Sequence, residues 1–196
     1  GVGGCESRVD GMIQFSRIFC MPNKWTFQMQ PVYELLKKYQ QTYRFGGWVD
    51  PFAGNSSIAD ITNDLNPESK TMFHKDAIDF LKGLGENTAN VVLFDPPYSS
   101  RQVSESYKSL GYSTNMETTQ CSYWSLLKRE IARILRTGGI CIGCGWNSNG
   151  IGLKHGFEMM EVLLINHGGV HNDTIITVEI SNKDYNQNKL FDTERR

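Results

Sequence analysis

Apolar residues recur along this chain with two spacings, and segments of the two kinds alternate. Apolar positions three or four residues apart, which predict helices, occur in 31–41, 77–84 and 123–135. Short runs rich in apolar and β-branched residues, which predict strands, occur in 44–52, 58–62, 91–94, 140–145, 157–166 and 174–180. Strands that alternate with helices predict a three-layer α/β domain with a mostly parallel sheet.

Two connections refine this topology. Only a short loop separates 157–166 from 174–180, which favours an antiparallel hairpin at the C-terminal end of the sheet. The interval between 44–52 and 58–62 is too short for the usual crossover of a dozen or more residues. We therefore expect the helix after the first parallel strand to be shortened or absent. A glycine turn at 137–139 is expected to end the helix before the strand at 140–145.

Length and charge bound the class of protein. The 196 residues fit about one domain, which we place at 23–181 between an N-terminal lead-in, 1–22, and a polar C-terminal tail, 182–196. No apolar run approaches the roughly 20 residues of a membrane span and no signal-peptide pattern opens the chain, so we expect a cytoplasmic protein without a membrane partner. The formal net charge of −1 argues against tight, sequence-independent binding of nucleic acid along an extended basic surface.

The cysteines and histidines do not predict a metal site. The five cysteines are scattered, and the CxxC of Cys141 and Cys144 lies inside a predicted strand without a second pair or a histidine at ligand spacing. His167, His171 and Asp173 fall in the predicted hairpin loop, again without ligand spacing. We expect reduced cysteines and no metal. The basic run of Lys128, Arg129, Arg133 and Arg136 is interpreted as a solvated helix face.

The tetrapeptide Asp95-Pro96-Pro97-Tyr98 directly follows the apolar run 91–94, so a strand would deliver it to the edge where α/β sheets bind ligands. The lone pair of an exocyclic amine on a nucleobase is delocalised into the ring. A carboxylate and a backbone carbonyl that accept its two hydrogens favour a pyramidal, nucleophilic nitrogen. Two prolines stiffen the loop, and the tyrosine offers a face for stacking. By itself the motif is equally compatible with a rigid turn.

A second strand end carries a related motif, Asp50-Pro51-Phe52-Ala53-Gly54. The glycine permits close approach of a ligand, and the neighbouring amides could face a carboxylate. Asp64 follows the next predicted strand and could accept hydrogen bonds from ribose hydroxyls, or cap a helix at 67–72. Asp76 follows another short apolar stretch and could equally cap the helix at 77–84. Acids at successive strand ends suit a cofactor that carries a sulfonium, an amine and a ribose.

Together these residues resemble the class I S-adenosylmethionine-dependent DNA N6-adenine methyltransferases, most closely those of small phage or prophage type. The resemblance covers most of the chain and implies a Rossmann-like methyltransferase sheet. It includes the segments 26–32, 62–67, 135–139 and 145–150 beside the two motifs. It implies that S-adenosylmethionine is bound by Phe27, Pro31, Asp50, Pro51, Phe52, Ala53, Gly54, Asp64, Asp76, Ala77 and Asp95.

The same resemblance implies that Asp95, Pro96, Pro97 and Tyr98 are the catalytic residues, in a bacterial or phage-infected cell. Further candidates for substrate contacts, beside Tyr98, are Arg101, Lys108, Trp146 and Asn147. We predict DNA as the partner, and a homodimer is a hypothesis that rests only on the small size. Three alternatives stay open: an RNA adenine or guanine amino-methyltransferase, an N4-cytosine DNA methyltransferase, and a cofactor-binding subunit with reduced catalysis.

Overall fold

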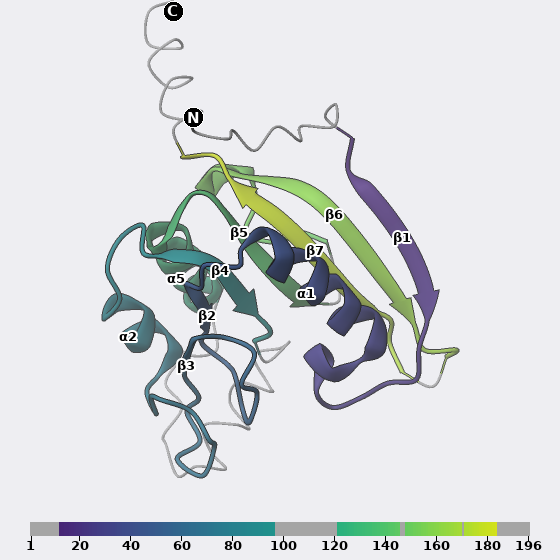
Figure 1. Ribbon diagram of the computed structural model, residues 1–196, viewed down its shortest axis with the longest axis horizontal. Helices are drawn as coiled ribbons and strands as arrows, with labels where there is room; N and C mark the ends of the chain where they lie inside the picture. The colour runs from purple at the N-terminus through teal and green to yellow at the C-terminus, as the bar shows by residue number, and fades with distance from the viewer. Residues whose placement is uncertain (1–11, 97–120, 146–147, 170, 184–196) are drawn as a thin grey trace, which may run out of the picture.

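The computed structural model describes residues 12–96, 121–145, 148–169 and 171–183. Their centre is a seven-stranded sheet in the order β1-β6-β7-β5-β4-β2-β3 (Figure 1). The strands are β1 (Gln14–Phe19), β2 (Trp48–Asp50), β3 (Ile61–Thr62), β4 (Ala89–Phe94), β5 (Leu135–Gly145), β6 (Phe157–Asn166) and β7 (Thr174–Ser181). Neighbouring strands are parallel except at β7, which is antiparallel to β5 and β6. The mostly parallel sheet with an antiparallel C-terminal strand is confirmed.

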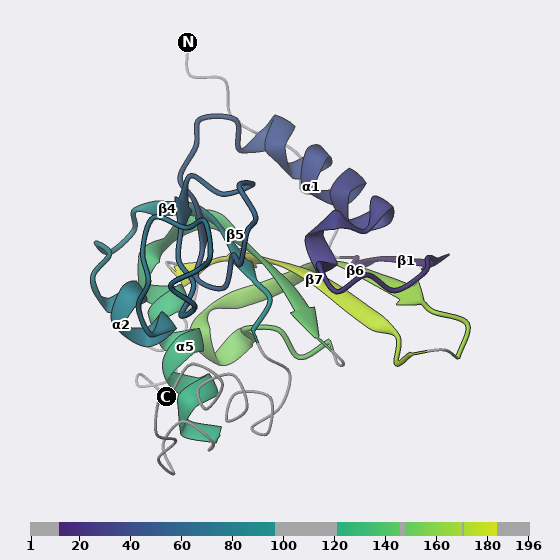
Figure 2. The ribbon, with the colours of Figure 1, turned by 90° about the horizontal axis from the view of Figure 1, so that it is seen from below.

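Helices cover both faces of the sheet, which confirms the three layers. Helix α1 (Gln30–Thr42) lies on one face, and α2 (Ala77–Lys82) and α5 (Cys121–Ile134) lie on the other (Figure 2). Two separate clusters of buried side chains correspond to these faces, one built around α1 and the other around α2 and α5. No helix in the described part of the chain is long and apolar enough to cross a membrane.

The sequence of α1 explains both its start and its docking. Pro31 occupies the first turn, where its missing N–H costs no hydrogen bond, and the apolar residues recur at helical spacing on the buried side. Polar contacts fix the helix on the sheet, because Tyr39 Oη donates to Glu161 Oε2 of β6 at 2.8 Å and Lys38 Nζ lies 2.7 Å from the same oxygen. Burial, followed by this hydrogen bond, raises the pKa of Tyr39, so the hydroxyl stays a donor.

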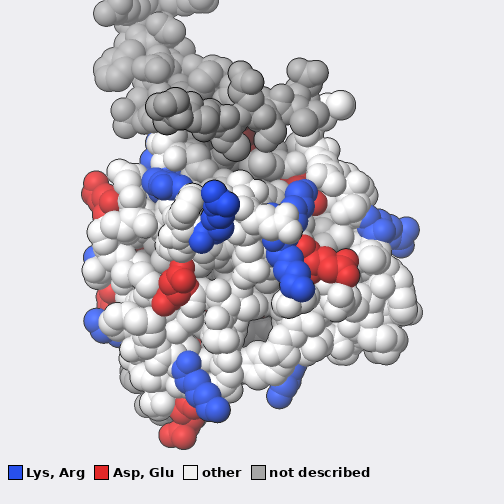
Figure 3. Space-filling model, viewed as in Figure 1, with Lys and Arg blue, Asp and Glu red and all other residues white. Residues whose placement is uncertain are grey.

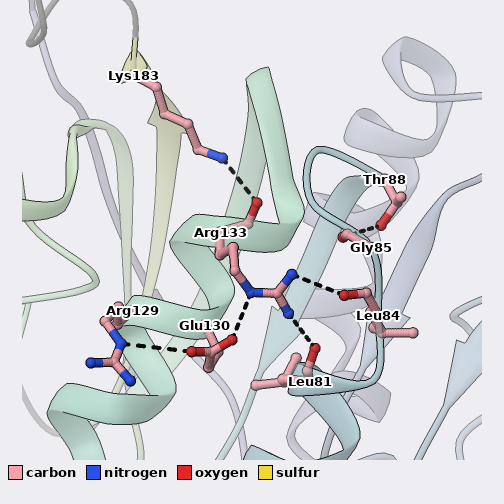
Figure 4. A network of polar contacts seen from close by, with 8 residues as sticks. All are labelled: Leu81, Leu84, Gly85, Thr88, Arg129, Glu130, Arg133 and Lys183. Carbon is pink, nitrogen blue, oxygen red and sulfur yellow. Dashed lines mark hydrogen bonds and ion pairs between the residues drawn. The ribbon is translucent and has the colours of Figure 1, made fainter.

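The contact between α2 and α5 depends on a residue that the sequence pattern assigns to solvent. Arg133 Nη1 and Nη2 donate to the carbonyls of Leu84 and Leu81 at 2.9 and 2.8 Å, just where α2 ends (Figure 4). Its Nε lies 2.7 Å from Glu130 Oε2, and the side chain of Glu130 is only 8% exposed. The solvated-face interpretation is therefore wrong for Arg133, which donates to carbonyls at and just beyond the end of the neighbouring helix.

Several boundaries differ from those expected. No helix occurs in residues 51–60, as predicted for the interval after the first parallel strand. The predicted lead-in, 1–22, contains β1, which pairs with β6 at the edge of the sheet. Helix α5 ends at Ile134 and Leu135 already pairs with Ala89, so the glycines at 138–139 form an irregularity inside β5 instead of the end of the helix.

Candidate functional site

The carboxyl ends of three neighbouring parallel strands bring three acids to one edge of the sheet. Asp50 is the last residue of β2, Asp64 follows β3 by two residues, and Asp95 comes directly after β4. Strand β2 lies between the other two. The charges of Asp95 and Asp64 both raise the pKa of Asp50, in addition to the larger effect of its burial. The structure thus gathers the acids that the sequence places at successive strand ends.

Asp50 is the most deeply placed of these acids, with 1% of its surface exposed. Its Oδ1 accepts a hydrogen bond from the Phe52 amide at 2.9 Å, whereas Oδ2 has no partner among the described residues. Burial raises the pKa of Asp50 from the ordinary 3.8 to about 8, so the carboxyl is protonated at neutral pH. An unpartnered buried oxygen is costly, and it marks a position where a donor or a cation of a ligand would be favourable.

The glycine loop after β2 is held by the segment that follows β3. The Ala53 amide donates to the Asn63 carbonyl and the Gly54 amide donates to Asp64 Oδ2, each at 2.9 Å. Asn63 is fully buried, and its side chain donates to the carbonyls of Pro51 and Lys75. These contacts take the place of a crossover helix. They also engage the amides of Ala53 and Gly54 within the protein.

Trp25 borders the glycine loop. Gly54 has a φ of +55°, and a Cβ added to it would lie 2.8 Å from the ring of Trp25. Glycine is required here both for the backbone conformation and for the approach of the ring. Phe27 instead belongs to the core beneath α1, and Pro31 is also buried. Sequence reasoning missed Trp25, because a tryptophan two residues before Phe27 carries no signal of contact with a loop 29 positions later.

Asp76 and Ala77 lie at the start of α2. Asp76 Oδ1 accepts from the amides of Ile78 and Asp79 at 2.8 and 3.3 Å, so Asp76 has the capping role that was the structural alternative for it. Asp64 does not cap a helix, because residues 67–72 are not helical. Its two oxygens accept from the amides of Gly54 and Asn66.

A cavity of about 270 Å³ opens beside the acidic edge, on the face covered by α5. Phe94 and Pro96 bound it at the end of β4, and Trp124 and Lys128 bound it from α5. Burial lowers the pKa of Lys128, and the negative charge of Glu179 partly offsets this effect by raising it. The cavity therefore combines flat apolar walls with one amine. Sequence reasoning missed Trp124 and Lys128 as wall residues, since helical spacing does not tell which sheet edge a helix reaches.

Glu179 shapes another wall of this cavity. Its carboxylate accepts from the amides of Ile151 and Gly152 at 2.6 and 2.9 Å, which holds the loop that carries Asn149 and Gly150. Gly150 has a positive φ, and a Cβ there would overlap the Glu179 carboxylate, so only glycine fits. This is the physical reason for the glycine that ends the segment 145–150.

Comparison with known proteins identifies the fold. No family model and no curated protein matches the sequence. Among solved structures, TrmN from Thermus thermophilus matches with a TM-score of 0.50 at 15% identity, over 78% of this chain and 49% of that one. The 1,6-didemethyltoxoflavin-N1-methyltransferase of Burkholderia thailandensis, with bound 1,6-didemethyltoxoflavin and S-adenosylhomocysteine, matches with a TM-score of 0.51 at 11% identity, over 79% and 78%. The chain has a Rossmann-like methyltransferase fold.

Within this methyltransferase fold the chain spans about half the length of the TrmN structure. Asp50, Asp64, Asp95 and Pro96 lie at or beside the carboxyl edge of the central strands, where α/β folds bind ligands. The remaining predicted residues Pro97, Tyr98, Arg101, Lys108, Trp146 and Asn147 lie outside the described residues. Cys141 and Cys144 are buried in β5 as expected, and burial raises the pKa of both thiols.

Proposed function

We propose that this chain transfers a methyl group from S-adenosylmethionine to the N6 amine of adenine in DNA. The observation that carries the proposal is the position of Asp95 and Pro96. They follow β4 directly, beside the ends of β2 and β3 in a methyltransferase fold, and Pro96 forms part of the cavity wall. A stiff turn placed elsewhere in the fold would have no such neighbours.

The residues at the edge fit the proposed cofactor. S-adenosylmethionine supplies an electrophilic methyl group on a sulfonium ion. Three acids close together stabilise a bound cation, and the unpartnered, buried Asp50 Oδ2 offers it an acceptor. Each oxygen of Asp64 accepts one amide and keeps a second lone pair, so the carboxylate can also accept from ribose hydroxyls. The ring of Trp25 lies against the same loop and adds an apolar wall.

The other side of the edge suits a nucleobase. The Asp95 carboxylate and the Pro96 carbonyl would accept the two hydrogens of the exocyclic amine and so leave its lone pair available for attack. Phe94, Pro96 and Trp124 give the neighbouring cavity flat apolar walls. An adenine inside a duplex cannot reach such a site, so the base would be flipped out of the stack. Binding and alignment of the two reactants would supply much of the rate.

Replacing Asp95 tests the assigned chemistry. Asp95→Ala should lower methyl transfer from labelled S-adenosylmethionine to DNA by at least about a hundredfold, because the amine loses its acceptor. Cofactor affinity, measured by calorimetry, should change little. Asp79→Ala is the matched control, since Asp79 is an exposed acid on α2. Equal loss of transfer and cofactor binding in Asp95→Ala would refute the role assigned to this residue.

The alternatives are separated by the acceptor. Parallel assays on DNA, transfer RNA and ribosomal RNA distinguish a DNA enzyme from an RNA enzyme, and the methylated nucleoside distinguishes N6-adenine from N4-cytosine. A chain that binds the cofactor but transfers to none of these acceptors would fit the subunit alternative and would end the present proposal.

A further inference from the structure

Within the described residues, the part of the sheet farthest from β3 carries a helix on one face only. Helix α1 packs over one face of β6 and β7, whereas none of the described helices lies over the opposite face of β1 and β6 (Figure 2). Gln14 and Ile18 of β1 are on the α1 side, because Gln14 accepts a hydrogen bond from Lys38 of α1 and side chains alternate along a strand. Phe15, Arg17 and Phe19 are therefore on the open face.

These three residues lie exposed along an edge strand. Phe15 is 66% exposed and Phe19 is 62% exposed, and Arg17 between them is exposed as well. Arg17 makes no hydrogen bond or ion pair within the described part of the chain. Two large aromatic rings left in water on either side of an unpaired guanidinium need an explanation beyond folding.

Rows of paired residues across the sheet connect β1 with the cavity of the candidate site. In one row, Gly143 of the cavity wall pairs in register with Thr177, Thr177 with Val162, and Val162 with Phe15; Thr177 and Val162 are themselves buried. A second row runs in the same way from Gly145 of the cavity wall to Arg17. Each row crosses three strand spacings, about 14 Å, the length of about four stacked nucleotides.

Away from the acidic strand ends, the exposed charges along this path are positive. Lys128 borders the cavity, Lys154 lies close enough to lower its pKa, and Arg17 lies at the far end. The acid on the path, Glu179, is buried and accepts two backbone amides. Asp173, in the hairpin beside Phe19, accepts hydrogen bonds from Asn166 and His167. A polyanion therefore meets cations at both ends of the path and no exposed carboxylate in either row.

We propose that the open face of β1 and β6 binds a single-stranded stretch of the nucleic acid that flanks the reacting base. Bases stack on Phe15 and Phe19, and Arg17 contacts a phosphate between them. Aromatic side chains on an open sheet are a general way to hold single strands, because every base has a face to stack. The proposal rests on the proposed function and adds to it the surface that holds the substrate outside the cavity.

A second copy of the chain is the rival occupant of this face. If two such faces paired about a two-fold axis, Arg17 of each copy would lie against the aromatic residues or the arginine of the other copy. Neither face offers a carboxylate in these rows to neutralise it. Burying an unpaired guanidinium is unfavourable, whereas a phosphate satisfies it. The charge of the face therefore favours nucleic acid.

Binding of a short fluorescein-labelled single-stranded oligonucleotide, followed by anisotropy, tests this surface. Phe15→Ala and Phe19→Ala should each weaken binding by about 5- to 150-fold, the cost of losing one stacked base. Arg17→Ala should reduce the slope of log Kd against log salt by about 0.7. Arg44→Ala and Phe45→Ala are matched controls, since this arginine and this 85%-exposed phenylalanine are neighbours outside both rows. They should bind as the wild type does.

The outcomes separate the surface from the catalytic proposal. If Phe15→Ala still transfers methyl groups with an unchanged kcat but a raised KM for the nucleic-acid substrate, the result supports the proposed binding surface. Wild-type transfer combined with unaltered binding in all three variants overturns the surface and leaves the proposed function intact. Failure of the wild type to bind the oligonucleotide overturns the surface as well. A dimer in light scattering that Phe15→Ala dissociates, without change in oligonucleotide binding, overturns it in favour of a second copy.

Discussion

At the residue scale, Asp50 combines deep burial with a missing partner. Its carboxyl accepts one amide, keeps the other oxygen unpartnered within the described residues, and has Asp95 and Asp64 as neighbouring charges. Such a group destabilises the fold unless a bound ligand compensates for its burial. We propose that a cationic ligand binds at the strand ends and lowers the pKa of this carboxyl, so that the carboxylate form becomes favourable.

This placement predicts a pH dependence of folding. The folded chain holds the Asp50 proton up to about pH 8, whereas the unfolded chain releases it near the ordinary pKa of 3.8. At pH values between these two pKa values, unfolding therefore releases a proton from Asp50. The free energy of unfolding should fall as the pH rises through this range, by at most about 1.4 kcal/mol per pH unit from this group, and level off above it.

Denaturant melts across the pH range measure this contribution. The slope of the unfolding free energy against pH should be more positive in Asp50→Asn than in the wild type across this range, because asparagine does not titrate. Asp79→Asn, which replaces an exposed acid on α2, should keep the wild-type slope. Identical slopes in wild type and Asp50→Asn would show that Asp50 is ionised in the folded chain.

The sequence predicted the acids of the site better than their partners. Asp50 and Asp95 are recognisable because each follows an apolar run and precedes a proline. That the Gly54 amide donates to Asp64 was not predictable, because it depends on how closely two loops approach when no helix separates them. The contact of Trp25 with Gly54 depends on tertiary packing in the same way.

At the element scale, helices and strands with strong apolar periodicity were predicted reliably, whereas short strands and edge strands were not. The amphipathic helix α5 and the apolar strand β6 were predicted within two residues. Strand β1 was missed because its residues, Gln-Phe-Ser-Arg-Ile-Phe, alternate in no clear pattern, and the strand exists by pairing with β6 more than 140 positions away. Strand β3 has only two residues, and the buried side chain of Asn63 supports the turn beyond it.

The contact between α2 and α5 gives a prediction on stability. Arg133→Ala should lower the free energy of unfolding by about 2–4 kcal/mol, since it leaves the buried Glu130 without its closest partner and removes the guanidinium donors from the carbonyls of Leu81 and Leu84. Arg129→Ala is the matched control in the same network (Figure 4). The Arg129 side chain is 62% exposed and lies 3.6 Å from Glu130, so its loss should cost less than about 1 kcal/mol. Equal effects of the two variants in denaturant melts would contradict this assignment.

At the scale of the whole molecule, recognition of a substrate cannot depend on a large basic field. The formal net charge is −1, and acidic and basic side chains are interspersed on the face seen in Figure 3. Affinity for nucleic acid would therefore come from a local path, the cavity with Lys128 and the open sheet face with Arg17. This path was not predictable from the sequence, because its residues come from β1, β5, β6 and β7 and meet only through the order of the sheet.

The identity of the methylated nucleoside tests the proposed reaction most directly. Purified protein would be incubated with isotopically labelled S-adenosylmethionine and unmethylated DNA, and in parallel with RNA, followed by digestion to nucleosides and mass spectrometry. We expect label in N6-methyladenine from DNA, and none when Asp95→Ala replaces the wild type. Label in another nucleoside, or none in any nucleic acid from protein that binds the cofactor normally, would contradict the proposed reaction.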